Sequence, residues 1–293
     1  MYELIKVTER CYYIDCPSKI GIILDGDGSG VYLIDSGNSR DTGKKVLKVL
    51  NQNGWKLKAI YNTHSHADHI GGNKYLQSQT GCKIYARGIE CDFTRHTILE
   101  PAFLYGAYPT EELKHKFLLA EECDAEYLTE DKLPCGIKML SLPGHSFDMV
   151  GFISDDGAAF IADSYSSEET LNKYAVSFIY DVKAYLETLE KLKNTEAKVF
   201  IPSHAPVSSD ISEIAQYNIG RVYEVADKIT SACDTPSTLE EILKRVFDSF
   251  SLSMSFEQYA LVGSAVRSYL TWLKSTGKIK VEFKENRLLW EKA

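Results

Sequence analysis

The chain has 293 residues, more than a typical single domain and fewer than two full-sized ones, which predicts one large domain with a small appendage. Its hydrophobic fraction of 44% is sufficient for a buried core. The formal charge of −8 disfavours a dedicated binder of nucleic acid or anionic membranes, because neutralising phosphates requires a basic face.

The first sixty residues combine short strands with one helix. A helical spacing of apolar residues around 46–50 ends at Gly54. Turn-forming residues separate four short β-rich runs, which are residues 12–14, 20–24, 31–34 and 57–61. Strands that alternate with helices in this way predict an α/β domain.

Residues 87–133 interrupt the alternation with a long stretch rich in aromatic side chains, namely Phe93, Phe103, Tyr105, Tyr108 and Phe117. A long insertion beside a site is often a lid. A helical excursion with its own small core accounts for the same composition equally well. Beyond it, a turn at residues 155–157 makes a hairpin of two strand-like runs. The resumed strands are predicted at residues 138–142, 149–153 and 158–161.

Beyond Asp181 the chain is mainly helical. Apolar positions from Val182 to Leu189 share one helical face, and a short strand at residues 198–201 then leads to His204. Two later helices are predicted by polar residues with capping-box spacing, which are Ser237 with Glu240 and Ser255 with Gln258.

The two C-terminal helices have apolar stripes that are too wide to remain in water. We expect them to pack on each other and on a terminal hairpin that carries Phe283 and Trp290 and turns at residues 285–286. These patterns predict a catalytic domain (1–220) with an insertion (87–133), followed by a C-terminal domain (221–293).

Three of the seven histidines lie within six positions, directly after the predicted strand at residues 57–61, and a carboxylate lies among them: His64, His66, Asp68 and His69. Zinc and similar metals prefer imidazole nitrogen and carboxylate oxygen as ligands. Open α/β sheets also place binding sites at strand ends. This pattern predicts a metal site. The two histidines of the insertion, His96 and His115, are expected to be surface residues.

The segment His64-Ser65-His66-Ala67-Asp68-His69 resembles the H-x-H-x-D-H signature of the metallo-β-lactamase superfamily. Further segments resemble the other characteristic elements of that family in order, at residues 33–37, 142–146, 160–163 and 202–207. The first of them, with Asp35, resembles the strand that supports the metal loop in these proteins. The resemblance implies an α/β fold, a four-layer αββα sandwich, with a small, mainly helical C-terminal domain that looks like a winged helix. Ala162, Ser203 and Ala205 stand where glycines are common in the family, which concerns loop packing and not the ligands.

The resemblance also implies a centre with two divalent metal ions. One ion would bind His64, His66 and His145, the other would bind Asp68, His69 and His204, and Asp163 would bridge them. Zn²⁺ is the expected metal, with Fe or Mn as options. Two such ions about 3.5–4 Å apart lower the pKa of a water between them. Asp68, the expected catalytic residue, would orient that water and move its proton.

Among the functions of this family, the sequence most resembles the glyoxalase II-like hydrolases, which implies cleavage of thioesters or related carboxylic esters of small molecules. A phosphodiesterase or ribonuclease is the first alternative, because the C-terminal segment is slightly basic and RNA-acting relatives have similar tails. The second is an oxidoreductase similar to persulfide dioxygenases, which bind a single iron. Tyr105 and Tyr108 are the candidate substrate contacts. Nucleic acid is a less favoured partner than a small molecule, and a homodimer stays open.

The N-terminal residues show no signal peptide, and no segment approaches the roughly 20 apolar residues of a membrane-spanning helix. The seven cysteines are scattered and include no C-x-x-C pair. Reduced thiols, no membrane partner and a cytoplasmic location are therefore expected.

Overall fold

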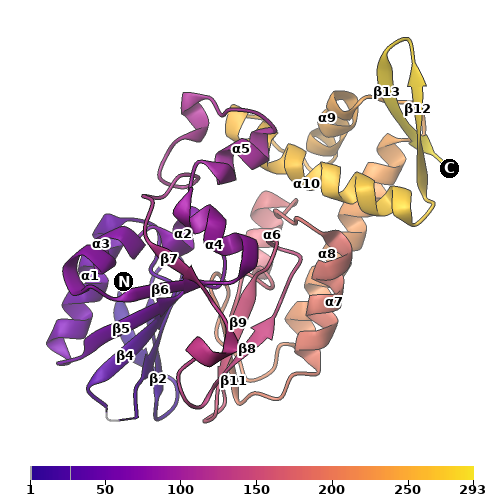
Figure 1. The fold of residues 1–293 in the computed structure, drawn as a ribbon. Helices are drawn as coiled ribbons and strands as arrows, with labels where there is room; N and C mark the ends of the chain where they lie inside the picture. Colours follow the sequence, from indigo (N-terminus) through magenta and orange to yellow (C-terminus); the bar gives the residue numbers. More distant parts are fainter. Residues whose placement is uncertain (1, 27) are drawn as a thin grey trace.

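The computed structural model describes residues 2–26 and 28–293 (Figure 1). The strands are β1 (Glu3–Lys6), β2 (Cys11–Asp15), β3 (Ile20–Leu24), β4 (Gly30–Ile34), β5 (Lys56–Tyr61), β6 (Lys83–Ala86), β7 (Ala125–Tyr127), β8 (Ile137–Ser141), β9 (Val150–Ser154), β10 (Ala158–Ala162), β11 (Val199–Pro202), β12 (Ile279–Lys284) and β13 (Arg287–Lys292). The helices are α1 (Arg40–Gln52), α2 (Ala67–Ile70), α3 (Asn73–Thr80), α4 (Gly88–Arg95), α5 (Leu99–Tyr105), α6 (Glu168–Tyr174), α7 (Val182–Lys193), α8 (Ser212–Ala232), α9 (Leu239–Ser249) and α10 (Phe256–Ser275), with short 3₁₀ turns η1 (Glu111–Leu113) and η2 (Glu130–Lys132).

The strands form two sheets and a separate hairpin. The larger sheet has the order β1-β2-β3-β4-β5-β6-β7, antiparallel from β1 to β4 and parallel from β4 to β7. The smaller sheet has the order β11-β10-β9-β8, in which β9 is antiparallel to both neighbours and β11 is parallel to β10. The predicted terminal hairpin is confirmed: β12 and β13 turn at Glu285 and Asn286, whose φ angles of 51° and 59° suit a two-residue turn.

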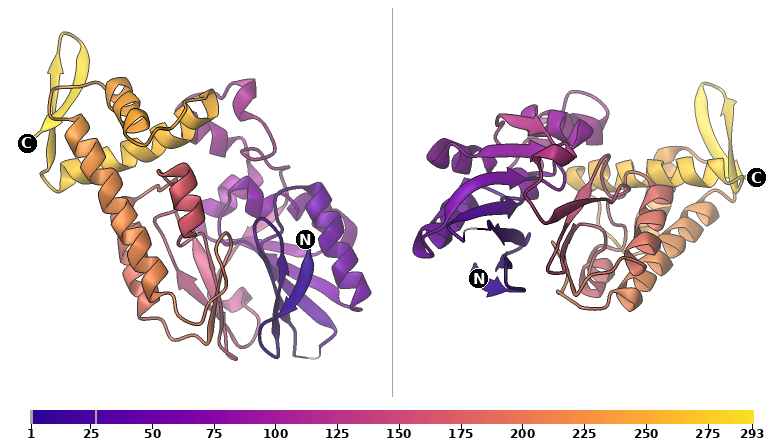
Figure 2. Two further views of the ribbon diagram at one scale, coloured as in Figure 1. Left: turned by 180° about the vertical axis from the view of Figure 1, so that it is seen from behind. Right: turned by 60° about the horizontal axis from the view of Figure 1, so that its bottom comes forward.

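The two sheets pack face to face, and helices cover their outer faces (Figures 1 and 2). Alternate strand residues point to opposite faces, so each sheet contributes to two cores. Ile34 and Phe160 lie in the core between the sheets. Leu33 packs in the core beneath α1 and α3, and Ile161 packs in the core beneath α7 and α8. The resulting order of helix, sheet, sheet and helix confirms the predicted four-layer sandwich.

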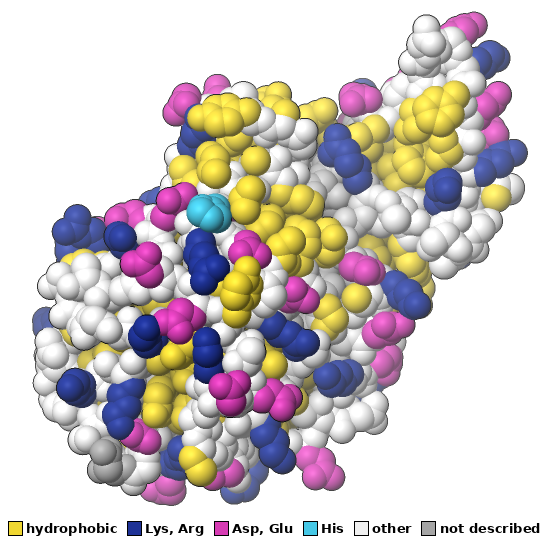
Figure 3. Space-filling model, viewed as in Figure 1, with side chains coloured by type: hydrophobic (Ala, Val, Ile, Leu, Met, Phe, Trp, Pro, Cys, Tyr) yellow, Lys and Arg dark blue, Asp and Glu magenta, His cyan; other side chains and the backbone are white. Residues whose placement is uncertain are grey.

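The insertion at residues 87–133 contains helices and also a strand, β7, which extends the edge of the larger sheet in parallel with β6. Leu104, Leu113 and Leu118 of the insertion form a small core together with Ala260 of α10. The insertion therefore joins the larger sheet to the C-terminal helices. Hydrophobic side chains are exposed where the insertion meets the C-terminal helices (Figure 3).

The C-terminal helices pack onto the outer face of the catalytic sandwich. Ile229 of α8, Val246 of α9 and Val266 of α10 belong to the same buried core as the outer face of the smaller sheet. Residue 220, where the two domains were divided from the sequence, lies inside helix α8. This helix is continuous and leads from the sandwich to the C-terminal helices (Figure 2).

The start of α9 and the packing of the hairpin differ in detail from the sequence prediction. Thr238 begins α9 in place of Ser237, and its capping box is completed by Glu241. Trp290 packs against the outer core as expected. The prediction for Phe283 is wrong, because this side chain is 75% exposed on the outer side of the hairpin.

The helices among residues 2–26 and 28–293 lack the combination of length and apolar character that crossing a membrane requires. All the cysteines are free of disulfide bonds, and Cys135 alone among them is exposed.

Candidate metal centre

The predicted ligands lie at one edge of the sandwich, where strands of both sheets end. Asp35 follows β4, and the first histidine loop, residues 62–66, follows the parallel strand β5. In the smaller sheet, β8, β10 and β11 run in the same direction, and they are followed by His145, Asp163 and His204. Carboxyl ends of parallel strands meet at one edge, so residues far apart in the sequence come together there.

Asp35 supports the first histidine loop. Its Oδ1 accepts a hydrogen bond from the backbone N–H of Thr63 at 2.8 Å, and its Oδ2 accepts one from Thr63 Oγ1 at 2.7 Å. The same Oδ2 lies 2.9 Å from Nδ1 of His69. Gly72 lets the following turn pass close to β4, because a Cβ at this position would overlap the carbonyl oxygen of Ser36. The segment at residues 33–37 thus holds the loop, as the resemblance implied.

Three ring nitrogens converge in a first group formed by His64, His66 and His145. Nδ1 of His66 lies 3.1 Å from Nε2 of His64 and 3.1 Å from Nε2 of His145. Nitrogens around a tetrahedral zinc ion, at about 2.0–2.1 Å from it, would be roughly 3.3–3.4 Å apart. The spacing of the three nitrogens is close to that value.

A second group consists of Asp68, His69 and His204. Asp68 Oδ2 lies 3.0 Å from Nε2 of His204 and 3.5 Å from Nε2 of His69. Asp163 lies between the two groups. Its Oδ1 is 3.3 Å from His69 Nε2, and its Oδ2 is 3.3 Å from His204 Nε2 and 3.6 Å from His145 Nε2. The structure therefore brings all seven predicted ligands together.

The hydrogen bonding of two atoms in this cluster indicates whether the residues fit a metal. His69 Nε2 and Asp163 Oδ1 are buried and have no hydrogen-bond partner. Buried polar atoms without a partner are uncommon in folded proteins. An imidazole nitrogen facing a carboxylate oxygen is the donor set that zinc accepts. The cluster thus fits a bound divalent cation on grounds independent of the sequence signature.

The ring nitrogens that point away from the cluster are also held in place. Their partners are Thr63 Oγ1 for His64 (3.0 Å), Asp35 Oδ2 for His69 (2.9 Å), the Phe178 carbonyl for His145 (3.2 Å) and the Pro17 carbonyl for His204 (2.8 Å). Such outer contacts fix the tautomer and orientation of a metal-binding imidazole.

Burial and charge shift the titration of the cluster in opposite directions. Burial lowers the pKa of His66 and the pKa of His145 to about 4. Burial has the same effect on His204, but the carboxylates of Asp163 and Asp68 outweigh it and raise the pKa of His204 to about 10. Without a metal, a proton on His204 therefore balances these carboxylates. A divalent cation would take the place of that proton.

Five of the ligands line an open cavity of about 350 Å³, namely His66, Asp68, His145, Asp163 and His204. Apart from the ligands, its lining is mainly apolar and acidic: Pro17, Ser18, Asn38, Glu100, Leu104, Phe117, Leu118, Phe178, Glu257 and Leu261. Residues 100–118 of the insertion and residues 257–261 of α10 form the rim. Neither segment contributes to the two ligand groups.

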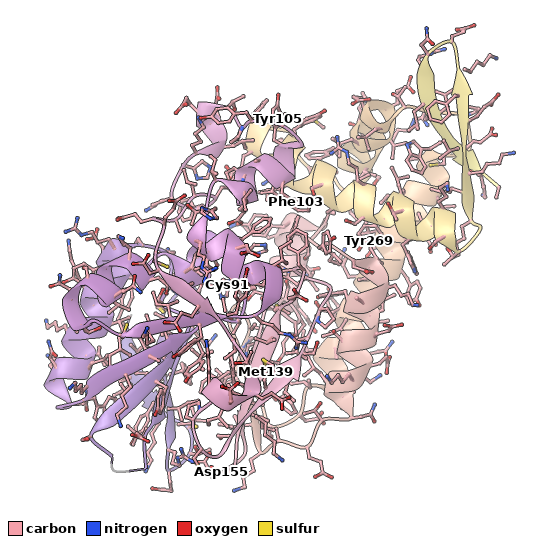
Figure 4. All side chains as sticks on the ribbon, in the orientation of Figure 1. Cys91, Phe103, Tyr105, Met139, Asp155 and Tyr269 are labelled. Carbon is pink, nitrogen blue, oxygen red and sulfur yellow. The ribbon has the colours of Figure 1, made fainter. Side chains whose placement is uncertain are left out.

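The two candidate substrate contacts, Tyr105 and Tyr108, are not among the residues that line this cavity. Leu104 lines the cavity, and a helix turns by about 100° per residue, so the next residue, Tyr105, faces away. Tyr105 lies beside one end of α10 (Figure 4), and its ring packs against Phe256 with ring centroids 5.7 Å apart. Tyr108 is 77% exposed, and the ammonium group of Lys114 lies over its ring.

Three residues close to the ligands were missed by the sequence analysis. Ser18 Oγ donates a hydrogen bond to Asp68 Oδ2 at 2.6 Å. Glu100 lies in the cavity wall, where burial and the nearby charge of Asp68 raise the pKa of its carboxyl group well above its usual value. Glu90 is completely buried. Glu90 and Glu100 stand among apolar residues of the insertion, which is a weak signal that does not reveal what they contact, whereas Ser18 offered none.

Comparison with known proteins agrees with this geometry. Residues 14–204 match the sequence profile described as the Metallo-beta-lactamase superfamily. A hydroxyacylglutathione hydrolase of Methylococcus capsulatus is 32% identical over 120 residues, which cover 41% of this chain and 38% of that protein. The Beta-lactamase-like protein 2 homolog of Drosophila melanogaster is 27% identical over 202 residues, which cover 65% and 63% of the two chains. The chain thus spans less than two thirds of the length of these curated relatives.

The solved structures extend the similarity of the fold to the whole chain. A Beta-lactamase domain protein from Burkholderia ambifaria has a TM-score of 0.74 at 16% sequence identity, and the match covers 99% of this chain and 94% of that protein. A metallo-beta-lactamase family protein from Thermus thermophilus has a TM-score of 0.72 at 16% identity, covering 99% and 98%.

Proposed function

Because the chain belongs to the metallo-beta-lactamase superfamily, we propose that it is a dinuclear metal-dependent hydrolase that cleaves thioesters or related carboxylic esters. The observation that carries this proposal is the position of Asp163. One of its carboxylate oxygens lies 3.3 Å from His69 Nε2, and the other lies 3.3 Å from His204 Nε2 and 3.6 Å from His145 Nε2. A carboxylate between two groups of donors is suited to bind two ions at once.

When bound, two Zn²⁺ ions would supply an activated water and polarise the carbonyl group of the substrate. His64, His66 and His145 would hold one ion. Asp68, His69 and His204 would hold the other, and Asp163 would contact both.

Asp68 would orient the attacking water and accept its proton. Its Oδ2 accepts a hydrogen bond from Ser18 Oγ at 2.6 Å and lies 3.0 Å from His204 Nε2. These contacts on two sides hold the carboxylate in one orientation. A fixed carboxylate within reach of the water is the arrangement that proton transfer requires.

The cavity supports a substrate with an apolar acyl group. Leu104, Phe178 and Leu261 provide apolar walls beside the ligands. Glu100 and Glu257 line the cavity, and none of its described lining residues is a lysine or an arginine. The phosphates of a nucleic acid would meet these carboxyl groups without a basic side chain to pair with. The lining therefore favours a thioester over a phosphodiester, as does the similarity to hydroxyacylglutathione hydrolases.

A small molecule is accordingly the proposed partner, and neither nucleic acid nor a membrane is proposed. The cytoplasmic location stays a prediction of the sequence, and a homodimer stays open.

Metal analysis combined with a panel of substrates tests the proposal. We expect two ions per chain and faster hydrolysis of acylglutathione or acyl-CoA thioesters than of bis-p-nitrophenyl phosphate, single-stranded RNA or a cephalosporin. Asp163→Asn should lower the metal content below two ions and reduce activity by at least about 100-fold, since one side chain serves both ions. Asp227→Asn, at an exposed position of α8, is the matched control and should change neither quantity.

Other outcomes would replace the proposal with one of its alternatives. A single, tightly bound iron in a fully active protein would exclude the dinuclear centre. Degradation of RNA that is lost in His64→Ala, without any thioesterase activity, would instead favour the nuclease.

A further inference from the structure

Glu90 of α4 is a buried carboxylate for which the proposed chemistry has no use. Its side chain is completely buried beneath the histidine loops and accepts four hydrogen bonds. Oε2 accepts from the backbone N–H of Ser65 at 2.9 Å and from Ser65 Oγ at 2.6 Å. Oε1 accepts from Ser146 Oγ at 2.5 Å and from the backbone N–H of Asp148 at 3.0 Å.

These four donors belong to the two loops that carry the first ligand group. Ser65 lies between His64 and His66, in the loop that follows β5 of the larger sheet. Ser146 follows His145, in the loop between β8 and β9 of the smaller sheet. Each carboxylate oxygen serves one of the loops. A single side chain therefore connects the two sheets directly beneath three converging nitrogens.

A further hydrogen bond, which runs from α4 to the loop at residues 145–148, reinforces the link that Glu90 makes between the two loops. Asp148 Oδ2 accepts a hydrogen bond from the backbone N–H of Ile89, at the start of α4, at 3.1 Å. Gly88 permits this contact, because its φ is 48° and a Cβ would overlap Asp148 Oδ2. Helix α4 and the loop at residues 145–148 are thus joined at two points, which gives the carboxylate of Glu90 a fixed position.

We infer that Glu90 is a positioning residue of the metal centre, which sets the spacing between His145 and the pair His64 and His66. This inference rests on the proposed metal centre. The outer contacts of the second ligand group do not involve Glu90: Ser18 contacts Asp68, Asp35 contacts His69, and the Pro17 carbonyl contacts His204. Glu90 therefore controls the affinity of the first ion and leaves the second ion unaffected.

Glu90→Gln keeps the size of the side chain but cannot accept all four hydrogen bonds. Whichever way the amide is turned, its NH₂ group faces the backbone N–H of Ser65 or that of Asp148, and a backbone N–H can only donate. One loop then loses its anchor. We expect the dissociation constant of the first ion to rise about 10–100-fold, as when outer-shell partners of other metal sites are removed.

The experiment titrates the metal-free, full-length protein with Zn²⁺ in competition with a chromophoric chelator, which resolves two affinities. Titration with Co²⁺, followed by visible absorption, reports which ligand set is occupied. Asp156→Asn is the control, because Asp156 accepts similar hydrogen bonds from Ser154 Oγ and from the backbone N–H of Arg10. It lies in the turn between β9 and β10, beside Asp155 at the opposite end of the smaller sheet (Figure 4). This variant should lower the melting temperature without changing either affinity.

Ser65→Ala and Ser146→Ala provide milder variants in case Glu90→Gln does not fold, since each removes one hydroxyl donor and leaves the carboxylate. Weaker binding of the first ion alone, in Glu90→Gln or in the serine variants, supports the inference. Unchanged affinities in every folded variant would overturn it. Equal weakening of both ions would also overturn it, because that result indicates a general structural role. An unmodified protein that binds fewer than two ions would contradict the proposed function first, and the role of Glu90 with it.

Discussion

At the scale of single residues, Ala162 shows how the backbone directs the shared aspartate. Its φ of 51° is left-handed, a conformation that costs a residue with a Cβ about 1–2 kcal/mol. The pairing of β10 with β11 shifts register between Phe160 and Ala162. The chain therefore bends directly before Asp163. Glycine, common at this position in the family, would adopt the same bend without strain.

Ala162→Gly should consequently leave the stability nearly unchanged, although Ala162 is almost fully buried. The relief of backbone strain offsets the loss of a buried methyl group, which contributes about 0.8 kcal/mol. Ala159→Gly in the same strand is the control, because it removes an equally buried methyl group without such relief. It should cost about 1–2 kcal/mol. Urea unfolding of the metal-free variants measures both changes, and equal losses would show that the bend at Ala162 is not strained.

The shifted histidine pKa values predict a maximum in the stability of the metal-free protein near pH 6.5. In the unfolded chain, His66 and His145 take up protons near pH 6.5, whereas in the folded protein their pKa is about 4. Protons therefore favour the unfolded chain, and the contribution of these two histidines to stability is lost as pH falls from 6.5 through 4. The pKa of His204 is raised to about 10, so its contribution is complete below about pH 6.5 and is lost as pH rises through 10. Thermal melts in a series of buffers should therefore show a decline on both sides.

Saturating Zn²⁺ should abolish the alkaline decline, because the metal replaces the proton that balances the carboxylates beside His204. Melts with and without zinc provide the comparison. An alkaline decline of the same size in both would mean that the metal does not bind at His204.

The ligands and the supporting segment at residues 33–37 could be predicted from the sequence, but the roles of Ser18 and Glu90 could not. His64, His66 and His69 lie close together directly after a predicted strand, and imidazoles gathered in this way strongly indicate a metal site. Ser18 and Glu90 are of residue types that are common on protein surfaces. Their roles depend on contacts with segments distant in the sequence, such as the hydrogen bond between Ser18 and Asp68.

At the scale of elements, the insertion is held to α10 by a small core that is separate from the larger ones. Leu113 is completely buried in this core. Leu113→Ala should remove about 2–5 kcal/mol of local packing, so residues 106–118 should open before the rest of the molecule unfolds. We expect faster limited proteolysis in this segment and a higher KM for the thioester, with metal content unchanged. Leu119→Ala, at the neighbouring half-buried position, is the control, and equal proteolysis of the two variants would contradict the prediction.

The elements predicted from the sequence agree with the structure where a pattern extends over several residues. β7 has only three residues, too few for an alternating pattern to stand out within the insertion. The start of α9 was ambiguous, because Ser237 and Thr238 are both polar and both precede a glutamate by three residues. Tertiary structure decides between them. The backbone of Ser237 pairs with Trp290 of the hairpin, which leaves Thr238 to begin the helix.

At the scale of the whole molecule, the C-terminal helices share one core with the catalytic sandwich. Truncation after Asp234 would expose Val225 and Ile229 of α8 and remove Glu257 and Leu261 from the cavity rim. We expect a lower melting temperature and aggregation, because this apolar surface has no other cover. The fraction that remains folded should still bind two metal ions, since all the predicted ligands precede the truncation.

Size-exclusion chromatography and metal analysis of the truncated protein check this prediction. A monomeric, folded truncate without metal would show that the tail takes part in the centre. The fold class and most of the longer elements could be predicted from the sequence, whereas β1, β6, β7 and α6 could not. The placement of the tail against the cavity could not, because it depends on contacts such as Leu113 with α10, which no local pattern indicates.

The loop of the last ligand is bound to the beginning of the chain. The Pro17 carbonyl accepts a hydrogen bond from His204 Nδ1, and the backbone N–H of Lys19 donates to the Ser203 carbonyl at 3.1 Å. A growing chain on the ribosome cannot complete this junction until both segments have left the exit tunnel. Contacts between such distant segments form slowly, because a large loop must close first. We therefore expect metal to bind late in folding, because the proposed site of the second ion is complete only after these two segments have met.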